Sequence, residues 1–89
     1  MDDQQISQAL EPLPHWRRDG DSIIRAVEAP SFLEGIDLVS TVARAAEAAD
    51  HHPDISINYK RVTLVFSTHS EGGLTQKDFD GARKVDELV

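Results

Sequence analysis

The chain has 89 residues and a formal net charge of −7, from 9 Lys and Arg against 16 Asp and Glu. This length fits a single small domain, residues 1–89. The acidity disfavours a nucleic-acid-binding surface, which needs cationic side chains to neutralise phosphates. Because cysteine is absent, the chain cannot form a disulfide framework, a thiolate zinc site, an iron–sulfur cluster or a cysteine nucleophile.

The sequence gives no indication of membrane insertion or secretion. The N-terminal segment is acidic, unlike a signal peptide. No run approaches the roughly 18 apolar residues that a membrane helix needs. We therefore expect a cytoplasmic protein that binds neither membrane nor nucleic acid.

The first predicted element is a short helix that ends near Pro12 or Pro14. A hairpin should follow, with strands over residues 16–18 and 22–28 and a tight turn at Asp19-Gly20, because Asp-Gly favours the positive φ of such turns. The helix prediction rests on apolar residues at helical spacing, namely Ile6, Ala9, Leu10 and Leu13.

A longer second helix is the clearest prediction. Ser31 and Glu34 form a capping box at its start, and Pro53 should end it because the residue before a proline avoids the α region. Its expected buried stripe consists of Phe32, Ile36, Val39, Ala43 and Ala46.

A second hairpin follows, because residues 55–59 and 62–66 both alternate apolar and polar side chains. If its turn is centred on Lys60-Arg61, then Ile57 pairs with Leu64. Continuing this register beyond the last hydrogen bonds places His52 opposite His69 on one face.

A final helix is predicted after Gly72-Gly73, with a capping box formed by Thr75 and Asp78 and a hydrophobic staple of Leu74 on Phe79. The element order is therefore α-β-β-α-β-β-α. It indicates an α+β fold, a four-stranded antiparallel sheet with helices packed on one face. The apolar stripe of the last helix is expected at Phe79, Ala82, Val85 and Val89.

Three of the four histidines, together with two carboxylates, surround the end of the second helix and the second hairpin. Glu47 and His51 are four residues apart, so their side chains can meet on the helix surface. A helix C-terminus and a nearby carboxylate both favour the imidazolium form. His51 would then suit proton transfer near neutral pH, and His52 and His69 would add further imidazoles.

Two other interpretations of these histidines stay open from the residues alone. The run Asp50-His51-His52-Pro53 can be an ordinary helix stop. Three imidazoles can also bind zinc. However, adjacent residues at a helix end point about 100° apart, and the chain has neither HxH nor HxxxH spacing, so no metal site is predicted.

The sequence resembles the pterin-4a-carbinolamine dehydratases along nearly its whole length. The specific part is the Asp-His-His-Pro block at residues 50–53 followed by Thr68-His69. Further matching residues are Trp16, Arg25, Phe32, Tyr59, Val62, the segment Gly72-Gly73-Leu74-Thr75 and Asp78.

This resemblance implies an enzyme without metal or cofactor that removes water from the 4a-hydroxytetrahydropterin released by aromatic amino-acid hydroxylases. The product is quinonoid dihydropterin. It also implies a homodimer or homotetramer and a functional link to such a hydroxylase. The alternative is a non-catalytic dimerisation or assembly cofactor on the same fold, since relatives of this family serve such roles.

The resemblance also implies roles for individual residues. We expect His51 to be the main acid/base, supported by Glu47. His69 would be a second proton-transfer group, and His52 would orient the pterin. The remaining substrate contacts are expected from Asp50, Trp16, Ser67 and Thr68.

Overall fold

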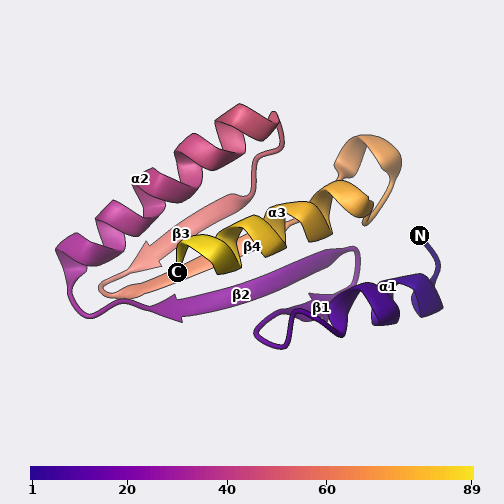
Figure 1. The fold of residues 1–89 in the computed structure, drawn as a ribbon, viewed down its shortest axis with the longest axis horizontal. Helices are drawn as coiled ribbons and strands as arrows, with labels where there is room; N and C mark the ends of the chain where they lie inside the picture. The colour runs from indigo at the N-terminus through magenta and orange to yellow at the C-terminus, as the bar shows by residue number, and fades with distance from the viewer.

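The computed structural model describes all 89 residues and contains three helices and one four-stranded sheet (Figure 1). The predicted order α-β-β-α-β-β-α is confirmed. The elements are α1 Asp3–Leu10, β1 Arg17–Asp19, β2 Ser22–Glu28, α2 Phe32–Ala49, β3 Asp54–Asn58, β4 Arg61–Phe66, a 3-10 turn η1 His69–Glu71 and α3 Gln76–Leu88. No helix is both long and apolar enough to cross a membrane.

All neighbouring strands of the sheet are antiparallel, in the order β1-β2-β4-β3. One face of this sheet carries the core, because alternate residues of β2 and β4 are buried there, including Ile23, Val62 and Leu64. All three helices contribute to the same core, and α2 and α3 lie side by side (Figure 1). Their core residues are Ile6 from α1, Val42 from α2, and Phe79, Ala82 and Val85 from α3.

The predicted buried stripe of α2 is wrong in part. Phe32, Ile36 and Ala43 are exposed, the first two at 46% and 39%. Ala46 is buried as predicted, and the helix also buries Gly35 and Val42. An added Cβ at Gly35 would lie 3.2 Å from Ile57 Cδ1, so the glycine allows this face of the helix to approach β3 closely. Since α2 is apolar on two faces, periodicity alone could not show which of them meets the sheet.

Both hairpin turns lie one residue away from their predicted positions. Asp19 pairs with Ser22, so the first loop is Gly20-Asp21, with Gly20 at φ 60°. In the second hairpin Asn58 pairs with Arg61. Its loop is therefore residues 59–60, where Tyr59 adopts φ 54°. A bulky residue rarely adopts positive φ, so no turn was predicted at this position.

The predicted register between β3 and β4 is wrong by two residues. Ile57 pairs with Val62 rather than Leu64, and the ladder stops at Asp54 opposite Val65. Because a shift of two residues keeps every side chain on its face, the apolar alternation survives unchanged. The predicted pairing of His52 with His69 is wrong, because it depended on the other register.

The end of α2 also differs from the prediction. The helix stops at Ala49, before Pro53, because Asp50 adopts the left-handed conformation (φ 51°). The N–H of Asp50 donates to the Glu47 carbonyl, and the N–H of His51 donates to the Ala46 carbonyl. This is the Schellman pattern of helix termination, and it turns the chain so that His51 leaves the helix axis.

Candidate active site

The candidate site lies at the end of the sheet where α2 ends and β3 begins. β3 starts at Asp54, which pairs with Val65 near the end of β4. The segment Asp50–Pro53 therefore enters the sheet beside the point where Ser67–His69 leaves it. The antiparallel pairing brings together two polar segments that are about sixteen residues apart in the sequence.

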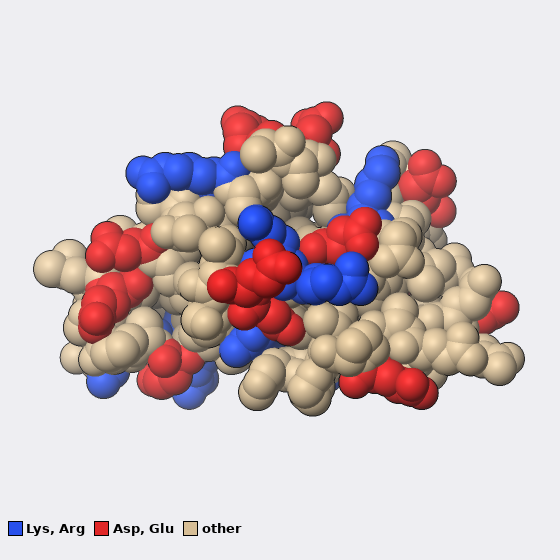
Figure 2. Space-filling model, viewed as in Figure 1, with Lys and Arg blue, Asp and Glu red and all other residues tan.

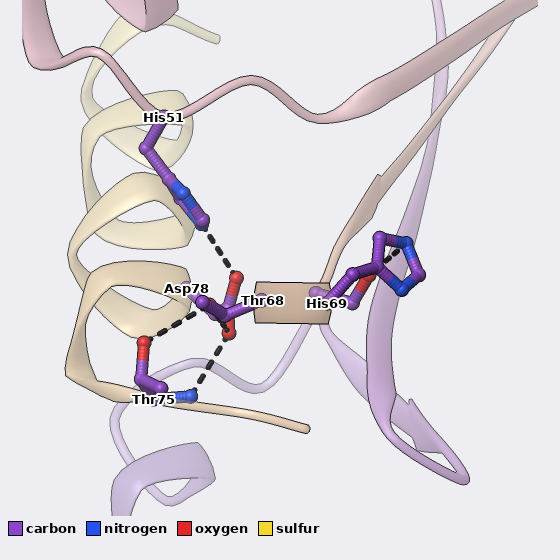
Figure 3. A network of polar contacts seen from close by, with 6 residues as sticks. His51, Thr68, His69, Thr75 and Asp78 are labelled. Carbon is purple, nitrogen blue, oxygen red and sulfur yellow. Dashed lines mark hydrogen bonds and ion pairs between the residues drawn. The ribbon is translucent and has the colours of Figure 1, made fainter. Parts of the chain in front are cut away.

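His51 makes the shortest side-chain contact of this region. Its Nε2 lies 2.6 Å from Oδ1 of Asp78, in the first turn of α3 (Figure 3). One face of the ring stacks on Phe66, with centroids 5.7 Å apart and planes 16° apart. The His51 side chain is only 16% exposed. Two contacts from different elements thus fix both the position and the tilt of this imidazole.

Asp78 is a fully buried carboxylate, with 0% exposure. Buried carboxylates are rare unless they are paired. Besides His51, its partners are the Thr75 backbone N–H, which donates to Oδ2 at 3.0 Å, and the Thr68 hydroxyl, which donates to the same oxygen at 2.8 Å (Figure 3). The contact with the Thr75 N–H is the hydrogen bond that the predicted capping box assigns to the Asp78 carboxylate.

Asp78 is the site residue that the sequence analysis missed. Its spacing from Thr75 indicated a helix start, and that local role is real. Nothing in the spacing showed that the second carboxylate oxygen would meet a histidine 27 positions earlier. Thr68, predicted to contact substrate, is 5% exposed, and its hydroxyl lies within this buried network.

The predicted pair of Glu47 with His51 is wrong. Oε1 of Glu47 lies 2.7 Å from Nε2 of His52 instead. The reason is the left-handed cap at Asp50, which ends the helical spacing on which the prediction depended. Both side chains of the observed pair are largely exposed, at 79% for Glu47 and 55% for His52. The Asp50 carboxylate makes no hydrogen bond within the chain, and the residue acts here through its backbone conformation.

His69 lies in η1, and its Nε2 is 3.1 Å from the Ser67 hydroxyl. Figure 3 shows its ring on the other side of Thr68 from His51 and turned away from Asp78. Since His69 is exposed, it belongs to the same end of the sheet without joining the buried network.

Trp16, which was expected to contact substrate, is a buried side chain in this structure. It is 5% exposed, its ring is 5.8 Å from that of Phe66, and its Nε1 donates to Oδ1 of Asp86 at 2.9 Å. Asp86 also pairs with Arg25 from β2. The structure therefore gives Trp16 a place in the core, joining the start of β1 to α3.

The structure contains one cavity, of about 170 Å³, between α2 and α3. Its walls are mainly small or apolar, and His51 is the only histidine among them. The three histidines therefore do not line a common cavity within one chain. The lining residues are Val42, Ala45, Ala46, Ala49, His51, Phe66, Lys77, Asp80, Gly81, Lys84 and Val85.

Gly81 controls the packing of Phe66 against α3. An added Cβ at Gly81 would lie 2.6 Å from Cε1 of Phe66, a ring that is itself 98% buried. We expect Gly81→Ala to destabilise the fold by about 1–3 kcal/mol from overpacking, although alanine has the higher helix propensity. The shift in the urea unfolding midpoint measures this effect.

Gly35→Ala is the matched control for Gly81→Ala. Its added Cβ would lie 3.2 Å from the flexible end of Ile57, and its other near neighbours, Ala29 and Val62, would be at ordinary contact distances of 3.6 and 3.7 Å. We therefore expect a loss of less than about 1 kcal/mol. Equal unfolding midpoints for the two variants would contradict the proposed clash with Phe66.

A family model described as pterin 4 alpha carbinolamine dehydratase matches residues 1–88. The chain belongs to the pterin-4a-carbinolamine dehydratase family. A relative from Nocardia farcinica, provisionally named as such a dehydratase, is 56% identical over 89 residues, which cover all of this chain and 94% of the relative. A similarly named protein from Mycobacteroides abscessus is 54% identical, over all of this chain and 95% of its own length.

Solved structures agree with the family assignment. A transcriptional coactivator/pterin dehydratase from Brucella melitensis matches with a TM-score of 0.94 and 30% identity, covering 99% of this chain and 96% of that one. A pterin dehydratase-like protein identified as a RuBisCO assembly factor shares the fold alone, at a TM-score of 0.66 and 16% identity. The predicted family, fold class and enzyme class, a hydro-lyase, are thereby confirmed.

The charges of this dehydratase-family chain are mixed on its surface. On the face in Figure 2, acidic and basic side chains lie among one another, and the net charge of −7 is not gathered into one patch there. The pterin carbinolamine that the family name implies as substrate carries no phosphate. Its recognition therefore needs no strongly cationic surface.

Proposed function

We propose that the chain dehydrates 4a-hydroxytetrahydropterin to quinonoid dihydropterin, with His51 as the main acid/base. The observation that carries this proposal is the placement of His51, held by Asp78 and Phe66 and still partly exposed. In the reaction the C4a–O bond breaks and its electron pair leaves with oxygen, which takes up a proton. N5 loses its proton, and that electron pair forms the C4a=N5 bond.

In this proposal the pterin binds between the segments Asp50–His52 and Ser67–His69. His69 would be a second proton-transfer group on the far side of the substrate, bonded to Ser67. His52 would orient the pterin, and Glu47 would hold His52 rather than His51. Substrate contacts by Asp50, Trp16, Ser67 and Thr68 stay predictions.

The test is to generate the carbinolamine with an aromatic amino-acid hydroxylase and tetrahydropterin, and to follow its absorbance with and without the purified protein. We expect decay of the carbinolamine to accelerate in proportion to protein concentration. Decay at the uncatalysed rate would contradict the proposed activity. Together with a stable protein partner in pull-down, that result would favour the non-catalytic assembly role.

A hydroxylase as functional partner and a cytoplasmic location also stay predictions.

We also propose that the chain forms a homodimer or homotetramer through the outward face of α2. Phe32, Leu33 and Ile36 are 46%, 71% and 39% exposed there. They lie within the same two turns of the helix, and contiguous exposed apolar side chains are typical of interaction surfaces. Covering this face would bury the apolar side chains that the single chain leaves in water.

Sedimentation equilibrium of the wild type and of Leu33→Glu tests this assembly. We expect the wild type to have two or four times the mass of one chain, and Leu33→Glu to be smaller, because assembly would bury an unpaired charge. Lys84→Glu, an exposed charge change on α3, serves as the control and should keep the wild-type mass. A monomeric wild type would refute the proposed assembly.

A further inference from the structure

The two ring nitrogens of His51 have different surroundings. Nε2 faces Oδ1 of Asp78 at 2.6 Å. An ionised carboxylate can only accept hydrogen bonds, so Nε2 must carry the proton of this contact. The tautomer of the neutral ring is thereby set by its hydrogen-bonding partner, as is usual for histidine. Nδ1 is then the nitrogen with a free lone pair.

Nδ1 is also the nitrogen that a ligand can reach. It makes no hydrogen bond within the chain. In residues that are not exposed, every buried side-chain nitrogen or oxygen has a hydrogen-bond partner, so an unpartnered Nδ1 cannot be a buried atom. His51 is not an exposed residue, yet its side chain is 16% exposed. Nδ1 is therefore at the accessible edge of the ring, and Nε2 at the edge held by α3.

We propose that Asp78 is the positioning residue that commits His51 to exchange protons with substrate through Nδ1. This inference rests on the proposed dehydratase function. When the ring is neutral, Nδ1 can accept the proton that N5 loses. When the ring is an imidazolium, Nδ1 can donate a proton to the departing hydroxyl while Nε2 remains bonded to Asp78.

The partners of Asp78 make Asp78→Asn a specific test of this role. Oδ2 accepts hydrogen bonds from the Thr75 N–H and the Thr68 hydroxyl. In the variant, the single amide oxygen must take that position, because the Thr75 N–H can only donate. The amide NH₂ group then faces His51 and donates to Nε2. This reverses the tautomer, so that Nδ1 carries the proton and cannot accept another.

Two-bond ¹⁵N–¹H correlation spectra of the whole protein distinguish a protonated ring nitrogen from an unprotonated one. The His51 signals are assigned by their loss in His51→Ala. At alkaline pH, where the ring is neutral, we expect the wild type to have a protonated Nε2 and an unprotonated Nδ1. In Asp78→Asn we expect the reverse pattern and a kcat at least about ten-fold lower, with KM changed less than about three-fold.

Asp86→Asn makes the same chemical change two turns later on α3, where the carboxylate meets Arg25 and Trp16. We expect it to leave the His51 nitrogen pattern as in the wild type. A protonated Nδ1 in the wild type would overturn the inference, and this measurement holds even if Asp78→Asn does not fold. A reversed tautomer with unchanged kcat would equally overturn it. By contrast, a wild type without activity but with the expected pattern would refute only the proposed function.

Discussion

His51→Ala is expected to lower the rate of carbinolamine dehydration by at least about ten-fold, and by as much as roughly 10²–10⁴-fold if proton transfer limits the reaction. Among the four histidines, only the His51 ring is held from two sides, by Asp78 and by Phe66. Its side chain is still 16% exposed. Its removal takes away the proposed proton-transfer group. The measurement is kcat/KM from the absorbance decay of the carbinolamine.

His15→Ala is the matched control for this experiment. His15 is the fourth histidine, exposed in the segment between α1 and β1, and its loss should leave the rate unchanged. If His51→Ala retained the wild-type rate while remaining folded, the acid/base role of His51 would be rejected.

Phe66→Ala is expected to destabilise the fold by about 3–5 kcal/mol, because it empties a large site in the core. Phe66 is 2% exposed and packs against the rings of Trp16 and His51. For a domain of this size, such a loss lowers Tm by at least about 12 °C. Differential scanning calorimetry measures it directly.

Phe66→Leu separates the structural role of this ring from its effect on His51. Leucine retains most of the apolar volume, so we expect the loss of stability to stay near or below about 1.5 kcal/mol. The flat surface under the imidazole is lost, however, and we expect kcat/KM to fall. A Phe66→Leu variant with full activity would show that the stacking of Phe66 does not help to orient His51.

Local patterns were sufficient for the order of helices and strands and for the end of the sheet at which three histidines lie. The alternation of Val62, Leu64 and Phe66 correctly indicated a half-buried strand, and all three side chains are buried. The capping residues Ser31 and Thr75 mark the observed starts of α2 and α3. Such predictions succeed because capping and alternation depend on residues within a few positions of one another.

The register and the histidine partners could not be obtained in this way. A two-residue shift between β3 and β4 leaves the apolar pattern unchanged, so the pattern could not exclude the wrong pairing. The left-handed conformation of Asp50 ended the spacing that would have joined Glu47 to His51. For α2, a helix with two apolar faces, the periodicity could not show that the face containing Gly35 packs near Ile57 of β3.

The sequence by itself determined the family, the order of helices and strands, and the end of the sheet at which the histidines gather. Only the tertiary structure decided that His51 is held by Asp78, that Glu47 belongs to His52, and that Trp16 is a core residue. Glu47 and His52 are only five residues apart, and they meet because Asp50 adopts the left-handed conformation. The contacts of His51 and Trp16, by contrast, join segments far apart along the chain. Their partners are selected by the packing of α3 against α2 and β4, which no local pattern encodes.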